Sequence, residues 1–401
     1  MPDAYSAMTG LMCSRTHETY AADRLWNFSP AGAPMLVTYD LERAARTLRR
    51  DAMHDRPTTM WRYHEVLPAP APDAVVSLDE GMTPLLSAPR LGARLGIRHL
   101  MIKEEGINPT GSFKARGLSV AVTMARALGA KELAIPSAGN AGGAMAAYAA
   151  RAGLPAHVYV PADAPASNRA ECLLSGAQVT LVRGFLNDCA ALVAQGAREH
   201  GWYELSTFKE PYRVEGKKTM AYELVEQMNG ELPDVILYPT GGGTGLVAMW
   251  KAFAELEALG WIGSKRPRLI SVQAEGCAPL VRALEAGATE SELWRNPTTR
   301  VPGLRAPRVI ADFLCLQAIR ESDGTAIAVP DEAMFVAQHE AAAAEGIALC
   351  PEGAACLVAL RELIGRGTVG RDERIVVFNT ASGLKYVEML PADAPVVDAP
   401  R

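Results

Sequence analysis

The chain has 401 residues, of which 49% are hydrophobic and 21% charged, ordinary values for a globular protein with one large domain or two. Its formal net charge of −5 provides no basic field, which argues against nucleic acid as a partner. No uninterrupted apolar run approaches the roughly 20 residues that a membrane span needs, and the first residues lack the pattern of a signal peptide. We therefore expect a cytoplasmic protein without a membrane partner.

The cysteines indicate a reducing environment. Seven of them are scattered along the chain, at positions 13, 172, 189, 277, 315, 350 and 356, with no C-x-x-C pair. An odd number without a spacing pattern predicts reduced, buried thiols rather than disulfides.

Short apolar runs alternate with Ala-rich helical stretches over most of the chain. This alternation predicts an α/β fold whose parallel sheets are covered on both faces. The predicted strands are 100–102, 133–135, 157–160, 178–182, 235–238, 269–272 and 375–378. The Pro-rich segment 67–72 indicates a connector between the N-terminal part and the main body.

Three short segments of the chain lead into predicted helices and carry residues suited to chemistry, and Lys114 lies in the first of these junctions. It follows the turn-forming residues 108–111 and precedes a stretch, 115–121, that has the pattern of a helix start. The positive end of a helix dipole disfavours a cation and so favours the neutral amine, which can condense with an aldehyde. The alternative is a solvated lysine in a Gly-rich loop, and the next two junctions argue against it.

The second junction is Ser137-Ala138-Gly139-Asn140-Ala141, which follows strand 133–135 and opens an Ala-rich helix. Free backbone N–H groups at a helix N-terminus bind anions, so a carboxylate is expected there, with the Asn140 side chain bonded to a ring hydroxyl. Taken alone, a tight turn with Asn140 in a left-handed conformation explains the same residues equally well.

The third junction is the Gly-rich segment 239–245, which lies between strand 235–238 and an apolar helix over 246–253. Its glycines and threonines predict a phosphate cradle of backbone amides and hydroxyls. The segment is not a P-loop, because no Lys-Ser/Thr pair follows. It is not a dinucleotide fingerprint either, because leucine at position 246 breaks the spacing.

Taken in this order, the three junctions resemble those of the fold-type II pyridoxal-phosphate enzymes, the family of threonine synthase, serine/threonine dehydratases and cysteine synthase. The motifs are most similar to those of threonine synthases. Segment 108–114 matches their Asn-Pro-Thr-Gly-Ser-Phe-Lys, 213–219 resembles Arg-x-Glu-Gly-x-Lys-Thr, and 379–385 resembles Thr-Gly-x-Gly-Leu-Lys. The resemblance runs from about Gly81 to Lys385. It implies a tryptophan synthase β-like α/β fold with two parallel-sheet domains and pyridoxal 5'-phosphate between them.

The resemblance also implies roles for matching residues. Lys114 forms the Schiff base with the cofactor and then acts as general base and acid. Asn140 bonds the ring oxygen, Phe113 packs under the ring or into the core, and Thr380 faces the pyridine nitrogen unless it is a capping residue after strand 375–378. The cofactor phosphate is expected at Gly241, Gly242, Gly243 and Thr244. The substrate is expected at Ser137, Ala138, Gly139, Ala141, Arg213 and Lys217.

The implied reaction converts O-phosphohomoserine and water to threonine and phosphate. It needs a cationic pocket for the leaving phosphate, for which the candidates are Lys209, Arg213, Lys217 and Lys218. The chain departs from the synthase pattern at Ala115, Ala138, Ala141 and Glu210, and a carboxylate at 210 would repel a phosphate dianion unless a cation compensates it.

These departures leave open a serine/threonine dehydratase, which deaminates its substrate, or a related β-elimination or replacement enzyme. Two further classes are disfavoured. A nicotinamide dehydrogenase leaves Lys114 unexplained, and a non-catalytic homologue does not require intact Lys114, Asn140 and Thr380.

The resemblance implies a large cofactor-binding domain over 67–115 and 211–390 and a small mobile domain over 116–210. We also expect a tail over 391–401 and a homodimer. Residues 1–66 form an N-terminal extension. Some members of the family carry a zinc ribbon there, but Cys13 lacks its partner because position 16 is threonine. One cysteine and His17 cannot close a tetrahedral zinc site, so we expect a ribbon-like remnant without metal. The side chains expected to hold it are Leu25, Trp26, Phe28 and Leu36.

Overall fold

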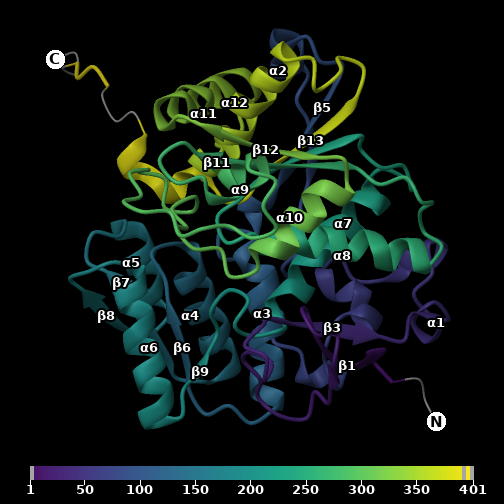
Figure 1. Cartoon of the computed structure of the whole chain (residues 1–401), viewed down its shortest axis with the longest axis vertical. Helices are drawn as coiled ribbons and strands as arrows, with labels where there is room; N and C mark the ends of the chain where they lie inside the picture. Colours follow the sequence, from purple (N-terminus) through teal and green to yellow (C-terminus); the bar gives the residue numbers. More distant parts are fainter. Residues whose placement is uncertain (1–3, 391–393, 398–401) are drawn as a thin grey trace.

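The computed structural model describes residues 4–390 and 394–397, whose strands form three sheets (Figure 1). The largest sheet has six strands in the order β12-β11-β10-β13-β5-β4. All neighbours in it are parallel except the short edge strand β4, which runs antiparallel to β5. The strands are β4 (Leu85–Ser87), β5 (His99–Glu104), β10 (Val235–Pro239), β11 (Arg268–Ala274), β12 (Thr325–Val329) and β13 (Arg374–Asn379).

The second sheet has four parallel strands in the order β8-β7-β6-β9. It lies at the lower left of Figure 1, with helices α4, α5 and α6 beside it. Its strands are β6 (Leu133–Pro136), β7 (Ala156–Pro161), β8 (Gln178–Val182) and β9 (Tyr203–Glu204), and the helices are α4 (Asn140–Ala152), α5 (Ala166–Leu174) and α6 (Leu186–His200). The two parallel sheets, whose strands are joined through helices, confirm the predicted α/β class.

Helices cover both faces of the six-stranded sheet. Successive side chains of a strand point to opposite faces, and β10 follows this rule with every residue buried. Ile236 packs into the core that contains residues of helices α7, α8 and α10, whereas Leu237 packs into the core that contains residues of α2, α11 and α12. The helices are α2 (Pro89–Leu95), α7 (Arg213–Gln227), α8 (Thr244–Ala258), α10 (Asp312–Glu321), α11 (Asp331–Glu345) and α12 (Pro351–Gly365).

Helix α3 (Lys114–Ala127) packs against both α4 and α7, so it links the two parallel sheets. The remaining elements are short: α1 (Leu41–Ala44), α9 (Pro279–Glu285), and the 3₁₀ turns η1 (Arg50–Asp55), η2 (Met60–Val66), η3 (Pro72–Ala74), η4 (Glu105–Ile107) and η5 (Gly383–Met389).

The N-terminal segment forms the third sheet, in which β1 (Met8–Cys13) lies between β2 (Thr19–Tyr20) and β3 (Met35–Tyr39) in antiparallel pairing. Its buried side chains include Leu11, Met35 and Val37, which the sequence analysis did not name. The side chains that it did name, Leu25, Trp26, Phe28 and Leu36, are half-buried. The interpretation of this sheet as a ribbon remnant stays a prediction.

All seven predicted strands are present, but three strands of the parallel sheets were missed. Strand β12 has the sequence Thr-Ala-Ile-Ala-Val, which resembles the Ala-rich helical stretches around it, and β4 and β9 are very short. The predicted domain boundaries stay a prediction. Of the predicted tail, residues 394–397 have no regular structure, and 391–393 and 398–401 lie outside the described residues.

The cysteine prediction is confirmed, because all seven thiols are free and buried. Among residues 4–390 and 394–397, none of the helices combines the length and the apolar character that a bilayer crossing requires.

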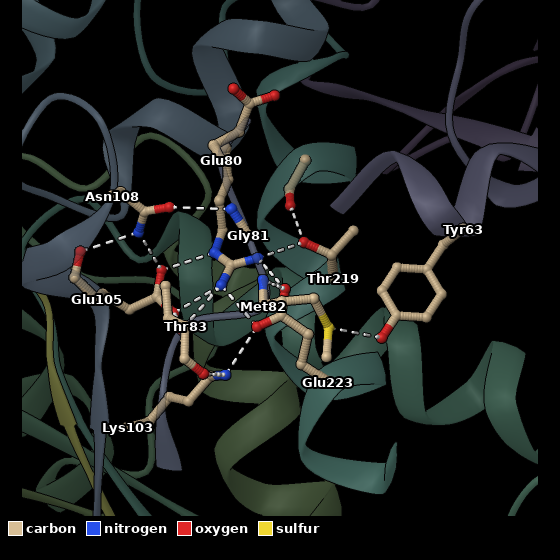
Figure 2. A network of polar contacts seen from close by, with 12 residues as sticks. Tyr63, Glu80, Gly81, Met82, Thr83, Lys103, Glu105, Asn108, Thr219 and Glu223 are labelled. Atoms are coloured by element: carbon tan, nitrogen blue, oxygen red, sulfur yellow. Dashed lines mark hydrogen bonds and ion pairs between the residues drawn. The ribbon is translucent and has the colours of Figure 1, made fainter. Parts of the chain in front are cut away.

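A fully buried cluster of charges lies next to the start of α3 (Figure 2). Arg116 donates from Nε to Glu105 at 2.6 Å and from Nη2 to Glu223 at 2.8 Å. Lys103 donates to Glu223 at 2.7 Å, so two cations face two carboxylates. Burial alone would raise the pKa of Glu223, but the charges of Arg116 and Lys103 lower it to about 2. The cluster therefore joins β5, η4, α3 and α7 around a charge-balanced centre.

We predict that Arg116→Met destabilises the fold by about 3–5 kcal/mol, because it leaves two buried carboxylates without their shared partner. Arg361→Met is the matched control, since its ion pair with Glu340 (2.8 Å) is exposed and contributes about 0–1 kcal/mol. Urea unfolding of both variants measures the difference. If Arg116→Met and Arg361→Met lower the free energy of unfolding by equally small amounts, the cluster does not hold these elements together.

Candidate active site

Lys114 is the first residue of α3, at the junction where the sequence placed it. Gly111 has a left-handed backbone (φ 63°), and its N–H donates to the Asn108 carbonyl at 2.7 Å, which closes the turn before the helix. The Lys114 side chain is half-buried, and its Nζ lies 4.4 Å from the centre of the Phe113 ring. Within the part of the chain that the structure describes, no side chain forms an ion pair with this amine.

The surroundings of Lys114 favour the neutral amine. Burial and the nearby Arg213 charge lower the pKa of Lys114 from 10.5 to about 7, while Glu352 acts in the opposite direction. Because the amine is nucleophilic only when it is neutral, it can react with an aldehyde near neutral pH.

The loop before α4 is held together by Ser137. Its hydroxyl accepts N–H groups from Gly142 at 2.9 Å and Gly139 at 3.2 Å. The Ser137 hydroxyl is therefore already hydrogen-bonded within the loop. Residues 138–141 beside it are half-buried. The left-handed alternative for Asn140 is wrong, because Asn140 begins α4 and does not have a positive φ.

Two side-chain amide oxygens in this region lack hydrogen-bond partners among the described residues. Asn140 donates from Nδ2 to the Tyr386 hydroxyl at 3.1 Å, whereas its Oδ1 is buried with no partner among the described residues. Asn168 of α5 is 3% exposed and its Oδ1 is likewise unpartnered. Its Nδ2 comes within 3.8 Å of the position that a Cβ would take at Gly139. An unpaired buried polar atom is costly, so both amides are suited to bind a polar ligand.

The Gly-rich segment forms the uncapped start of α8. The helix begins at Thr244, and no side chain of the described residues bonds its first N–H groups. At Gly243, which has φ 77°, a Cβ would overlap the Cys315 sulfur, whereas at Gly242 it would lie 3.1 Å from Thr207 Cγ2. A Cβ at Gly241 would overlap the Gly303 carbonyl. The free N–H groups and the helix dipole make this a site for a phosphate group.

Thr380 follows strand β13 and is joined to the lysine motif. Its carbonyl accepts the Phe113 N–H at 2.9 Å, and its hydroxyl lies 3.7 Å from the Cys350 sulfur. The capping alternative is wrong, because Ser382 caps the following turn η5 by accepting the Leu384 N–H at 3.3 Å. The Phe113 ring is half-buried and meets Tyr238 edge-on at 6.2 Å, so it packs into the core while it also faces Lys114.

Arg213 and Lys217, on the first turns of α7, are buried cations without carboxylate partners in the described chain. Arg213 donates from Nη1 to the Leu205 carbonyl at 2.7 Å, but its Nε and Nη2 are buried and unpartnered. Among residues 4–390 and 394–397, the only acceptor for Lys217 is the Arg213 carbonyl, at 3.3 Å. Burial lowers the pKa of both groups, and for Lys217 the charges of Arg213 and Lys114 lower it further. The charge of Glu210 opposes the decrease in both pKa values.

Lys209 and Lys218 are wrong candidates for this cationic pocket. Lys209 pairs with Glu204 at 2.8 Å, and Lys218 pairs with Glu215 at 2.7 Å and Glu255 at 2.9 Å. Carboxylates therefore neutralise both lysines.

Glu210 also has a local role that the sequence did not reveal. Its carboxylate accepts the N–H groups of Tyr212 at 2.7 Å and Arg213 at 3.1 Å, so it caps α7. Burial raises the pKa of Glu210 to about 7 against the lowering effect of Arg213, which further weakens its repulsion of an anion.

Sequence reasoning missed Asn168, Glu352 and Tyr386. Glu352 is the second residue of α12 and is 4% exposed. It accepts from the Tyr386 hydroxyl and from the Gly303 N–H, each at 2.9 Å. Asn168 and Glu352 lie outside every motif that the sequence analysis named, and Tyr386 directly follows the segment 379–385 without being part of its pattern.

The chain belongs to the pyridoxal-phosphate dependent enzymes, because the model of that family matches residues 76–381. The fold agrees, since the structure of maize serine racemase superimposes with a TM-score of 0.66 at 23% identity, over 77% of this chain and 91% of that one.

Two curated relatives, both threonine synthases, match nearly the whole chain. The one from Methanocaldococcus jannaschii is 36% identical over 93% of this chain and 92% of its own length. The one from Methanosarcina acetivorans is 36% identical over 94% and 92%.

The residues present fit pyridoxal 5'-phosphate, the cofactor of this family. An unpaired amine with a lowered pKa suits its aldehyde, and the uncapped start of α8 suits its phosphate. The unpartnered Asn140 Oδ1 suits a polar atom on its ring. The recognition of the family and of its cofactor from the sequence is confirmed.

We predict that Lys114 of the cofactor-free protein reacts with pyridoxal phosphate rapidly above about pH 7 and more slowly below it, because protonation removes the nucleophile. An ordinary lysine would need a pH above its usual pKa of ~10.4. Borohydride reduction at each pH followed by peptide mapping measures the rate and the site. Label on another lysine would contradict the assignment, and Lys114→Ala should lose several orders of magnitude in turnover.

Gly242→Val should weaken cofactor retention without unfolding the protein, since its Cβ meets only the end of the Thr207 side chain while the branched group narrows the approach to the loop amides. Gly365→Val is the control, because a Cβ there meets nothing within 4 Å. Cofactor content after dialysis and the thermal midpoint of the apo protein provide the measurements. If Gly242→Val retains the cofactor as well as the parent protein does, the cofactor phosphate does not bind at this loop.

Proposed function

We propose that this chain converts O-phosphohomoserine and water to threonine and inorganic phosphate, the reaction of a threonine synthase. The observation that carries the proposal is the pair of buried, unpartnered guanidinium nitrogens of Arg213 beside the unpaired Lys217. Its curated relatives with this name, which match over nine-tenths of the chain, support the same reaction.

The cationic pocket is suited to a phosphate group. A guanidinium can donate two parallel hydrogen bonds to neighbouring phosphate oxygens, and Nε and Nη2 of Arg213 are the two donors left free. Buried basic groups to which no carboxylate bonds directly are unfavourable as cations until an anion binds to them. A dianionic leaving group therefore gains from this pocket, whereas a substrate that releases a neutral group would leave the cations uncompensated.

We assign the proton transfers to Lys114. The bound cofactor acts as an electron sink that makes protons near the amino-bearing carbon acidic. The Lys114 amine accepts the proton from the α carbon, gives it up, and then accepts one from the β carbon as phosphate leaves the γ carbon toward Arg213 and Lys217. Water then supplies a hydroxyl to the β carbon, and the α and γ carbons are each protonated again. The low pKa of Lys114 suits this exchange, because a base whose pKa lies near the working pH both accepts and returns protons.

The remaining sites complete the proposal. We place the cofactor phosphate at Gly241, Gly242, Gly243 and Thr244, and its ring near Phe113, Asn140 and Thr380. The substrate carboxylate lies at the backbone of 137–141, where hydroxyl side chains are missing at Ala138 and Ala141. Asn168 lies beside this loop with an unpartnered amide oxygen, so we add it as a residue that orients the substrate.

The homodimer, the cytoplasmic location and the division into a large domain and a small mobile domain are also parts of this proposal. They stay predictions of the sequence analysis, and sedimentation of the purified protein tests the first of them.

We predict release of inorganic phosphate from O-phosphohomoserine with formation of threonine. Arg213→Gln should lower kcat/KM for this substrate by about 10²- to 10³-fold, because two charge-assisted hydrogen bonds to the phosphate are lost. Arg198→Gln, on the exposed face of α6, serves as control. If phosphate is not released while threonine yields 2-oxobutanoate, deamination is the reaction instead.

A further inference from the structure

A chain of hydrogen bonds links Asn140 to a buried carboxyl group through a tyrosine. Asn140 donates from Nδ2 to the Tyr386 hydroxyl at 3.1 Å, and that hydroxyl donates to Glu352 Oε1 at 2.9 Å. The three residues come from α4, η5 and α12, so the chain bridges elements beside both parallel sheets.

Each end of this chain has an unpartnered atom. Glu352 Oε1 also accepts the Gly303 N–H at 2.9 Å, whereas Glu352 Oε2 is buried without a partner in the described part of the protein. At the other end, Asn140 Oδ1 is buried and equally unpartnered. The middle of the chain is closed, because Tyr386 is 3% exposed. Of the two unpartnered atoms, Asn140 Oδ1 is the one at the start of α4, where the proposed function places the cofactor ring.

The direction of the hydrogen bonds decides which atom of the Asn140 amide is left free. When Glu352 is ionised it can only accept, so Tyr386 donates to it and in turn accepts the Asn140 Nδ2–H, which leaves Oδ1 free. When Glu352 carries a proton it can donate to the Tyr386 oxygen. The tyrosine proton then points to the amide, which must turn to present Oδ1 to it, and Nδ2 is left free.

We propose that Glu352 and Tyr386 are positioning residues that set which end of the Asn140 amide faces the ring oxygen of the bound cofactor: Oδ1 when Glu352 is ionised and Nδ2 when it is protonated. The inference rests on the placement of the cofactor beside Asn140 in the proposed function. A free Nδ2 donates to an unprotonated ring oxygen, whereas a free Oδ1 accepts from a protonated one. The hydrogen-bonded residues Glu352, Tyr386 and Asn140, called the relay below, therefore couple the proton on Glu352 to the proton on the cofactor.

The surroundings of Glu352 support two accessible states. Burial raises the pKa of Glu352, and hydrogen bonds from its own backbone and from Tyr386 oppose the increase. The titratable groups that face it are Lys114 on α3, Tyr386 on η5 and Cys350 directly before α12. Of these, only Lys114 is a basic group, and its low pKa favours the neutral amine near neutral pH.

The absorbance spectrum of the bound cofactor tests the relay, because it reports the protonation of the chromophore independently of turnover. The purified holoenzyme is titrated across the pH range in which it stays folded, without substrate. We expect a pH-dependent spectral change in the parent protein that is absent in both Glu352→Gln and Tyr386→Phe. The double variant should match either single variant, since both changes break the same chain.

Two matched variants control for the loss of a carboxylate or a hydroxyl elsewhere. Tyr20→Phe removes another tyrosine that donates to a glutamate, Glu18, at 2.7 Å, but in the N-terminal sheet. Glu362→Gln removes a carboxylate on α12 that pairs with Arg366 at 2.9 Å. Both should keep the spectral midpoint of the parent protein.

The outcomes separate the relay from the proposed function. A Glu352→Gln spectrum with the parent midpoint overturns the relay, and so does a Tyr386→Phe spectrum that titrates like the parent. Borohydride labelling of Lys114 in the same samples reports the cofactor position. Label absent from Lys114 in the parent protein would contradict the proposed function itself, whatever the spectra show.

Discussion

Two groups of ionisable side chains meet at the first turns of α3, and carboxylates form ion pairs with only one of them. Arg116 lies between Glu105 and Glu223, so its charge is balanced and the elements that carry these residues are joined. Lys114, two residues earlier, has no such partner and faces the equally unpaired Arg213 and Lys217. The balanced cluster keeps the helix in place, and this allows an unbalanced group to persist beside it. Because the unbalanced cations cost stability without a ligand, they indicate where an anion binds.

The sheet order brings the separate motifs to one edge. In the six-stranded sheet β13 lies between β10 and β5, and all three run parallel. The carboxyl ends of parallel strands meet at one edge, so the Gly-rich segment after β10, Thr380 after β13 and the lysine motif after β5 are neighbours there. Asn140 follows β6 of the other sheet, and Tyr386 links it to the same edge. A cofactor placed at this edge would contact both parallel sheets.

The errors of the sequence analysis have a common cause. Lys209 and Lys218 have the residue type and the position in the chain expected of a phosphate pocket, yet carboxylates from other elements neutralise them. Glu210 was expected to repel an anion, yet its carboxylate accepts N–H groups at the start of α7. A sequence shows how many charges stand near a motif, but pairing depends on which elements pack together. The anion pocket is therefore defined by the cations that tertiary contacts leave unpaired.

The sequence by itself determined the α/β class, the seven predicted strands, the three junctions and the enzyme family. These features depend on local patterns, since periodicity, glycines before helices and motif order are properties of short segments. Only the tertiary structure decided which of four candidate cations remain free, and that Glu352, Tyr386 and Asn168 lie beside the motifs. Those residues are far apart in the chain, and they act together because helices α5 and α12 and turn η5 pack around the same edge. Burial and charge pairing exist only after the chain has folded, and they control the pKa of Lys114 and the hydrogen bonds of Asn140.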